Sequence, residues 1–350
     1  MEHISFPSIN QYRQVVKNVR SSADYHGVPY PKVKYEFSVK IHGSNAGICR
    51  TVNGGKDDIY FQSRERILSI ESDNAGFCSF GTGLKSIFNA VIDRIVEETG
   101  ATEGVVQIFG EWFGGNIQKG VGVSGLDKML CVFGVRISND AESRQWESKE
   151  LIQKIFGIAI NTNSRIYTKY DFPTWVLEID FDRPELVQNQ IVELTERVEH
   201  DCPVARLFKA SAEVGTLVGE GVVGVPIIEA DTPSFVAGNT FKVKGERHSV
   251  SKVKTTAKLD PEKMTSQHEF VEKTLTENRM NQFVEKMREL GHPMDITSTG
   301  LYIKAISSDI FREEADTMVA SLIEPKDVMG IIATTAKKFW FDAINKEAGL

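Results

Sequence analysis

Apolar and polar residues alternate with a period of two in several short segments of the first 250 residues. In KYEFSVKI, residues 34–41, the odd positions are aromatic or branched, and Lys40 is on the polar, even face. Similar runs, separated by Gly, Asn, Asp and Ser, occupy residues 58–64, 105–113, 128–137, 221–228 and 240–245. The pattern predicts six strands, the first of which places Lys40 at its polar end, followed by turn-forming residues from His42 to Asn45.

Apolar residues at helical spacing appear at three places in the same part of the chain. Residues 7–20 predict a helix with Ser8 as its N-cap, and residues 84–100 predict one closed by Gly100. A third helix is expected over 183–200. The strands outnumber the helices and do not alternate regularly with them. This arrangement indicates an α+β domain with antiparallel sheets, not a doubly wound fold.

After about residue 255 the pattern becomes helical throughout. Residues 268–290, 307–323 and 324–346 read as amphipathic helices. Ser308 or Asp309 is a candidate cap, and Pro325 stands near a helix start. We expect a first domain over 1–255, a boundary near 255–265, and a small all-helical C-terminal domain over 266–350.

Charge is unevenly distributed along the chain. The 350 residues carry a formal net charge of −7, which excludes a protein coated with basic surface. A basic strip nevertheless contains Lys242, Lys244, Arg247, Lys252, Lys254 and Lys258 against the single acid Glu246. The strip is consistent with a phosphate-bearing ligand held in one place, and equally with a solvated lysine-rich segment.

Membrane and secretory signals are absent from the pattern. No apolar run approaches the ~18 residues of a membrane span, and the first residues lack the basic lead and apolar block of a secretory signal. The four cysteines show no CxxC pair and no zinc spacing: Cys49, Cys78, Cys131 and Cys202. We therefore expect buried thiols and a cytoplasmic location. Separately, we expect a monomer.

Polar side chains at strand ends supply the candidate chemistry. Lys242 and Lys244 share one face of a strand, where adjacent cations favour an anion between them. Glu111 and Glu220 stand where apolar strands meet polar, glycine-containing segments. Phosphoryl transfer needs such cations for phosphate oxygens and a carboxylate for Mg²⁺. A nucleophilic Lys40 needs a lowered pKa, which the two lysines and a metal ion would produce by repulsion.

Six ordered sequence blocks resemble a known family. KIHGSN, from Lys40 to Asn45, is a KxxG nucleotidyl-transfer motif, and its HGSN ending resembles the RNA ligase 2 family of phage nick-sealing and kinetoplastid RNA-editing ligases. A lone KxxG is weak evidence, but the other blocks follow in order over residues 35–250. They are QSR ending at Arg64, FGEWFGGNIQKG around Glu111, CVFGVRI around Phe133, GEGVVG around Glu220, and FKVKG with Lys242 and Lys244. FPSINQY resembles the family's opening segment, with Phe6 at its aromatic position.

The resemblance implies a role for each matched residue. Lys40 would form a covalent lysyl-AMP, Lys242 and Lys244 would act on the α-phosphate, and Glu220 would serve Mg²⁺ (or Mn²⁺). The implied contacts to ATP further include Arg64 on the sugar and phosphate side, Glu111 on the ribose hydroxyls, Phe133 stacked on adenine, and Ile41 and Asn45. The implied RNA contacts are Gln118 and Lys119, with Arg247 and Lys252 from the basic strip.

The implied protein is an ATP-dependent RNA ligase with a nucleotidyltransferase domain of packed antiparallel sheets and flanking helices. It would join 3′-hydroxyl and 5′-phosphate RNA ends, in nick repair, and would act in the host cytoplasm if phage-encoded. The alternatives are a DNA ligase or a capping enzyme, which usually show KxDG where this chain has KIHG, and an inactive nucleic-acid-binding relative. One departure concerns the base: many relatives have Glu before the nucleophile, whereas this chain has Val39, so its preference for ATP over GTP is open.

Overall fold

The computed structural model describes residues 1–138, 143–146, 149–162, 165–208, 217–227, 238–249 and 266–347. The chain divides into two compact units, Met1–Gly245 and Glu246–Leu350. The expected boundary near 255–265 lies outside the described residues.

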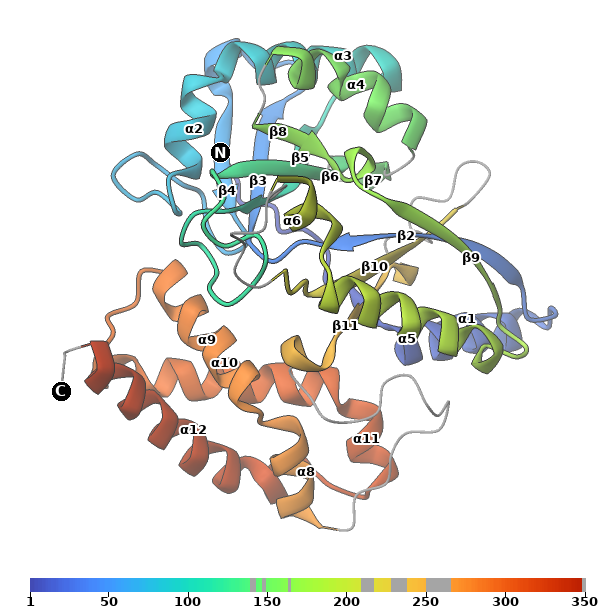
Figure 1. The fold of residues 1–350 in the computed structure, drawn as a ribbon, viewed down its shortest axis with the longest axis vertical. Helices are drawn as coiled ribbons and strands as arrows, with labels where there is room; N and C mark the ends of the chain where they lie inside the picture. The colour runs from blue at the N-terminus through green and yellow to red at the C-terminus, as the bar shows by residue number, and fades with distance from the viewer. Residues whose placement is uncertain are drawn as a thin grey trace. The chain divides into compact units, whose positions relative to one another are not determined.

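The first unit contains a five-stranded sheet, here called sheet A (Figure 1). Its strand order is β1 (Asn10–Gln11), β11 (Phe241–Lys244), β10 (Gly221–Pro226), β2 (Lys32–Lys40) and β9 (Thr174–Asp180). All neighbours are antiparallel except β1 and β11. The odd residues of β2 are buried with helices α1 (Tyr12–His26) and α5 (Glu185–His200), so Lys40 is on the opposite face.

A second sheet, sheet B, has the order β4 (Tyr60–Ser63), β3 (Ser44–Thr51), β5 (Val105–Phe113), β6 (Met129–Ser138) and β7 (Ser143–Trp146). β8 (Ile166–Thr168) pairs with β6 in parallel. One face packs on α2 (Phe77–Gly83), α3 (Lys85–Thr99) and α4 (Lys149–Thr162). The other contributes Phe113, Met129 and Cys131 to the core of sheet A. Short elements are α6 (Pro203–Phe208), η1 (Lys56–Asp58) and η2 (Lys169–Asp171).

The second unit consists of helices. They are η3 (Glu246–His248), α8 (Gln267–Thr274), α9 (Glu277–Glu289), η4 (Ile296–Ser298), α10 (Thr299–Glu313), α11 (Ala315–Ala320) and α12 (Pro325–Glu347). Their core surrounds Trp340, which stacks on Tyr302 with ring centroids 4.7 Å apart. With the two mostly antiparallel sheets of the first unit, this helical unit confirms the predicted fold class.

All six predicted strands are present, but several boundaries were wrong. Ser44 and Asn45, predicted in a turn, begin β3. Ser8 does not cap α1, because Asn10 and Gln11 are extended and pair with β11 before the helix begins. Asp309 lies inside α10, because buried apolar residues continue the helix upstream and packing outweighs the local capping signal.

Two expectations from composition can be examined directly. All four cysteines are free and buried. None of the helices in the described part of the chain is long and apolar enough to cross a membrane.

Candidate active site

Strand register brings Lys40 and Lys244 together on one face of sheet A. In the antiparallel pairings, Gly221 of β10 is opposite Lys40 on one side and Lys244 on the other. Residues paired in this way point to the same face of a sheet. Two lysines 204 positions apart in the sequence therefore flank one glycine.

Glu220, immediately before that glycine, lies between the two ammonium groups. Lys40 Nζ donates a 2.7 Å hydrogen bond to Glu220 Oε2, and Lys244 Nζ lies 2.9 Å from Oε1. The Glu220 side chain is 1% exposed, whereas Lys40 and Lys244 are 20% and 16% exposed. The carboxylate is thus enclosed while both cations reach solvent.

Gly221 is required for this close approach. Its φ is +145°, and a Cβ there would lie 2.1 Å from the carbonyl oxygen of Val243. Any other residue would push β10 and β11 apart. The absence of a side chain therefore brings Lys40 and Lys244 within reach of one carboxylate.

Sheet B contributes the other wall through Glu111. Gly43 N donates a 2.9 Å hydrogen bond to Glu111 Oε1, and Asn45 is paired in register with Glu111. A Cβ at Gly43 would lie 2.4 Å from the carbonyl oxygen of Trp112, so only glycine fits the turn. Gln118 Nε2 donates to Gly43 O at 3.2 Å. The turn after Lys40 therefore carries the chain from sheet A to sheet B within the site.

The ion pairs set the charge of these groups. Burial disfavours the charged form of Lys40, but the Glu220 and Glu111 carboxylates outweigh it and raise the pKa of Lys40. Burial likewise acts against the charge on Glu220, yet Lys244, Lys40 and His42 hold its pKa well below the ordinary value. The expected lowering of the Lys40 pKa by the two lysines and a metal ion is not found among the protein groups alone, because Glu220 lies between Lys40 and Lys244.

Glu111 shows the opposite shift. Burial raises its pKa to about 7, and the negative charge of Glu220 adds to the effect, while Lys40 and His42 act against it. Its Oε1 is already occupied by the Gly43 amide. Near neutral pH, Glu111 can therefore exchange a proton when a ligand changes the surrounding charge.

Phe133 belongs to a bulge in β6. The register passes from Phe109–Gly134 to Gly110–Val132, so Phe133 is the extra residue. Its ring is half-buried and contacts Phe6, with centroids 5.1 Å apart. Two positions earlier, Cys131 pairs with Glu111, which places Phe133 on the strand next to the site.

The remaining candidate residues of the first unit differ in their exposure to solvent. Arg64 is exposed, and its charge acts on Lys40 to lower the pKa. Lys119 is exposed next to Gln118. Ile41 and Val39 are each 7% exposed in the core of sheet A, so the side chain that replaces the usual glutamate points away from Lys40. Asn45 Oδ1 is buried without a hydrogen-bond partner in the described ranges.

Three candidates come from the basic strip. Lys242 shares the face of Lys40 and Lys244 through its pairing with Val223, which in turn pairs with Ser38. Arg247 is exposed in η3 of the second unit, where its carbonyl accepts from Asn278 Nδ2. Lys252 lies outside the described residues.

His42 is a site residue whose contact sequence reasoning missed. The sequence pattern places it only among turn-forming residues, but its Nδ1 lies 3.1 Å from Glu220 Oε2, the oxygen that Lys40 also contacts. His42 follows Lys40 by two positions, the spacing that keeps residues on one face of an extended segment. That spacing was the available signal.

The carboxylates suit a metal ion held mostly by phosphate and water. No group of three His, Cys, Asp or Glu side chains able to hold a metal occurs within the described ranges. Glu220 is ionised and lies between the ammonium groups of Lys40 and Lys244. Mg²⁺ commonly takes one or two carboxylates and fills its remaining positions with phosphate oxygens and water. The donor set therefore fits Mg²⁺ that arrives with a nucleotide.

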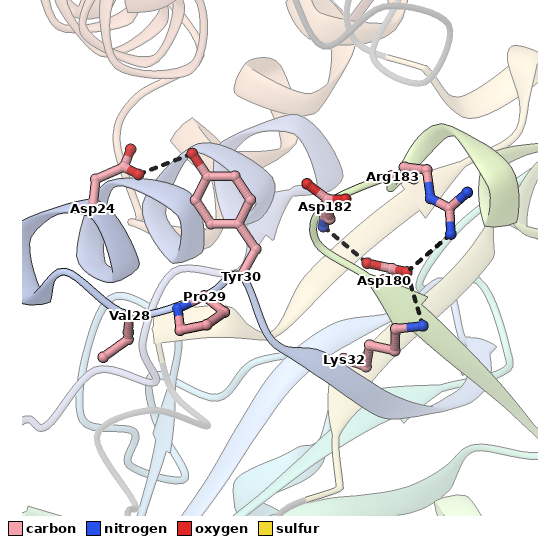
Figure 2. A pocket seen from close by; sticks show the side chains of 8 residues that line it. All are labelled: Asp24, Val28, Pro29, Tyr30, Lys32, Asp180, Asp182 and Arg183. Carbon is pink, nitrogen blue, oxygen red and sulfur yellow. Dashed lines mark hydrogen bonds and ion pairs between the residues drawn. The ribbon is translucent and has the colours of Figure 1, made fainter.

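A separate pocket lies at the other end of β2 (Figure 2). It is lined by Asp24, Val28, Pro29, Tyr30, Lys32, Asp180, Asp182 and Arg183. Lys32 begins the strand that Lys40 ends, so the two lie roughly 26 Å apart along it. The Lys32 ammonium lies 3.1 Å from Asp180, and Tyr30 donates to Asp24. This pocket is thus distinct from the candidate active site.

Comparison with known proteins assigns the family. Structural similarity was found to Naegleria gruberi RNA ligase, in a variant with AMP and Mn at a TM-score of 0.43 and 13% identity, and in another with ATP and Mn at 0.43 and 15%. These matches cover 70% of this chain and 56% and 58% of the Naegleria chains, so this chain spans little more than half of their length. No curated protein matches the sequence. The sequence model of the family "RNA ligase" matches residues 33–244, from the start of β2 to Lys244, and the chain therefore belongs to the RNA ligase family.

Proposed function

We propose that this chain is an ATP-dependent RNA ligase that joins a 3′-hydroxyl to a 5′-phosphate through a lysyl-AMP. The observation that supports this most is the group of Lys40, Glu220 and Lys244, in which one buried carboxylate separates two solvent-reaching ammonium groups. Such a group has surplus positive charge where a phosphate could bind. Within this group, Lys40, which begins the KIHG motif, would be the nucleophile.

In the proposed first step, Lys40 Nζ attacks the α-phosphorus of ATP, forms a P–N bond and releases pyrophosphate. Lys40 must first pass a proton to solvent, and the Glu220 carboxylate opposes this loss because it raises the pKa of Lys40. Lys244 and Lys242 would bind the α-phosphate oxygens and stabilise the charge that develops there. Mg²⁺ would neutralise phosphate charge near Glu220 when bound.

Two further transfers complete the proposed reaction. AMP passes from Lys40 to a 5′-phosphate RNA end, and a 3′-hydroxyl then displaces AMP to form the phosphodiester. Each transfer depends on positioning and electrostatic stabilisation by the same groups. Glu111 and Asn45 would bind the ribose side, Phe133 the adenine ring, and Arg64 the sugar and phosphate; Ile41 would use only its backbone, since its side chain is buried in the core.

RNA contacts are proposed for both units. Gln118 and Lys119 belong to the loop that holds Gly43, and Arg247 and Lys252 belong to the basic strip. The helical domain, proposed to cover 266–350, would help to hold the strand with the 3′-hydroxyl. Deleting it should spare lysyl-AMP formation and impair sealing; loss of adenylylation itself would contradict this division.

The test is incubation of purified protein with Mg²⁺ and α-labelled ATP or GTP, followed by a denaturing gel. Label from ATP should survive denaturation in the wild type and vanish in Lys40→Ala. Sealing assays on nicked RNA and DNA would then identify the substrate. Label from GTP instead would favour a capping-type enzyme, and no label with either nucleotide, in protein free of bound AMP, would favour an inactive nucleic-acid-binding relative.

A further inference from the structure

The segment before α1 crosses from sheet B to sheet A. This strap, residues 2–11, begins beside β4, where Tyr60 Oη donates a 2.8 Å hydrogen bond to Glu2 O (Figure 1). It ends as β1, where Asn10 and Gln11 pair with Phe241 and Lys242. The strap therefore links the sheet that carries Phe133 to the strand that carries Lys242 and Lys244.

Gln62 of β4 anchors the strap through its side chain. Its Nε2 donates to Ile4 O at 2.6 Å, and its Oε1 accepts from Ile4 N at 3.3 Å. The Gln62 residue is fully buried, while its backbone position pairs with Gly47 of β3. One amide thus supplies both hydrogen bonds that Ile4 would otherwise obtain from a neighbouring strand.

Two residues after Ile4, the strap places Phe6 against the candidate base-binding ring. The Phe6 centroid lies 4.9 Å from that of Phe109 and 5.1 Å from that of Phe133, both edge-on. Phe133 is the extra residue of a bulge, so the regular pleat does not fix its direction. The buried Phe6 ring, itself held against Phe109, is the lateral support that fixes it.

We propose that Phe6 and Gln62 are positioning residues for the nucleotide base: Gln62 holds the strap, and Phe6 holds the Phe133 ring in the orientation that stacks on adenine. The inference rests on the proposed function, because it takes Phe133 as the stacking residue. The other end of the strap is held separately, by β1 and by Asn10 Nδ2, which donates to Gly238 O at 2.8 Å. A change at Gln62 therefore loosens the Phe6 half without touching β1, while the contacts of Tyr60 with Glu2 O and of Arg136 with Ser5 O remain.

The experiment measures KM for ATP and kcat for lysyl-AMP formation in the full chain. Gln62→Met, which keeps the volume and removes both hydrogen bonds, and Phe6→Leu should each raise KM about three- to tenfold with kcat within about twofold of wild type. Phe6→Tyr keeps the ring and should retain the wild-type KM. The matched control is Val106→Ala, buried among the sheet B residues that pack on α2, α3 and α4, which should lower Tm while leaving KM unchanged.

Combination with Phe133→Ala separates positioning from general damage. Phe133→Ala alone should raise KM about tenfold or more, and adding Gln62→Met should then change KM less than twofold, because the ring being positioned is gone. Additive effects, or equal KM changes in Gln62→Met and Val106→Ala, would overturn the inference. If Phe133→Ala raises KM but Gln62→Met and Phe6→Leu do not, only the strap inference fails; if Phe133→Ala leaves KM unchanged, the proposed stacking role fails with it.

Discussion

The two units each enclose a buried charge cluster, and the clusters are built in opposite ways. In the first unit, one carboxylate, Glu220, lies between Lys40 and Lys244, both of which reach solvent. In the second unit, one cation, Arg279, is fully buried against Glu313 at 2.8 Å, Asp309 at 3.3 Å and Glu314 at 3.7 Å. The first cluster has excess positive charge that is exposed to solvent. In the second cluster, acidic side chains surround the buried Arg279.

The exposure of the cations distinguishes a cluster that can bind a ligand from one that only holds helices together. Arg279 Nη1 also donates to Thr274 O, so its guanidinium joins α8, α9 and α10 without room for a ligand. Burying charges is costly, and neither cluster is explained by stability alone. The open cluster keeps its cations accessible to an anion, whereas the closed cluster fixes how the helices meet. The following changes should break or sharpen this contrast.

The largest effect is expected from Arg279→Met. Removing Arg279 takes the buried cation away from Glu313 and Glu314, which should destabilise the second unit by about 3–5 kcal/mol. Urea unfolding followed by limited proteolysis of the helical unit measures the loss. Arg312→Met is the matched control, because Arg312 pairs with the same Asp309 from an exposed position and should cost less than about 0.5 kcal/mol. Equal losses in the two variants would contradict the structural role of the buried cluster.

Next in size is Lys244→Ala in the open cluster. Glu220 keeps Lys40 and His42 as partners, so the melting temperature should fall less than in Arg279→Met. The rate of lysyl-AMP formation should fall about 10²- to 10³-fold, since a charge-stabilising group is lost. Single-turnover kinetics with labelled ATP checks this. A large fall in Tm with an unchanged rate would make the open cluster a structural one.

A smaller, pH-dependent effect is expected at Glu111. Its folded pKa of about 7 exceeds the ordinary 4.5, so the folded state retains a proton that the unfolded chain has lost. This contribution to stability is present below about pH 4.5 and is lost as pH rises toward 7. Glu111→Gln keeps the acceptor for Gly43 and removes the titration, so at pH 8 it should be more stable than wild type by on the order of 3 kcal/mol.

Urea midpoints for both proteins from pH 5 to pH 8 test this sign. The variant's advantage should appear mainly between pH 5 and pH 7 and level off above. Parallel curves would show that Glu111 does not carry the shifted titration.

The smallest expected effect is that of salt. Raising NaCl from 50 to 300 mM should increase KM for ATP several-fold, because the cations of the open cluster are partly solvated and screened. The buried Arg279 cluster should respond by less than about 0.5 kcal/mol in unfolding free energy. A closed cluster as salt-sensitive as the open one would remove the distinction between them.

Much of the first unit could be predicted from the sequence, because strand alternation is a local property. The period of two placed Lys40, Lys242 and Lys244 on polar faces, and all six predicted strands exist. The meeting of Lys40 with Glu220 depends on the register between β2 and β10, which no local pattern contains. Only the family resemblance pointed to it.

The misses share a physical cause, which is tertiary pairing. Ser8 carries a good capping side chain, but the next residues join a sheet. His42 was predicted only as part of a turn, because its partner Glu220 is 178 positions away. Val39, which raised the question of base selectivity, points into the core, so its replacement of a glutamate says nothing direct about the base.

The turn between β2 and β3 makes the length of the KIHGSN motif as consequential as its letters. Lys40 ends one sheet and Asn45 is the second residue of a strand in the other. One residue inserted or deleted within this motif would invert the inward and outward faces of β3. Asn45 would then turn toward the helices and Ala46 toward the candidate active site. Sequence searches for related sites should therefore allow no insertion or deletion within this motif. Loop grafts into the protein should keep its number of residues unchanged.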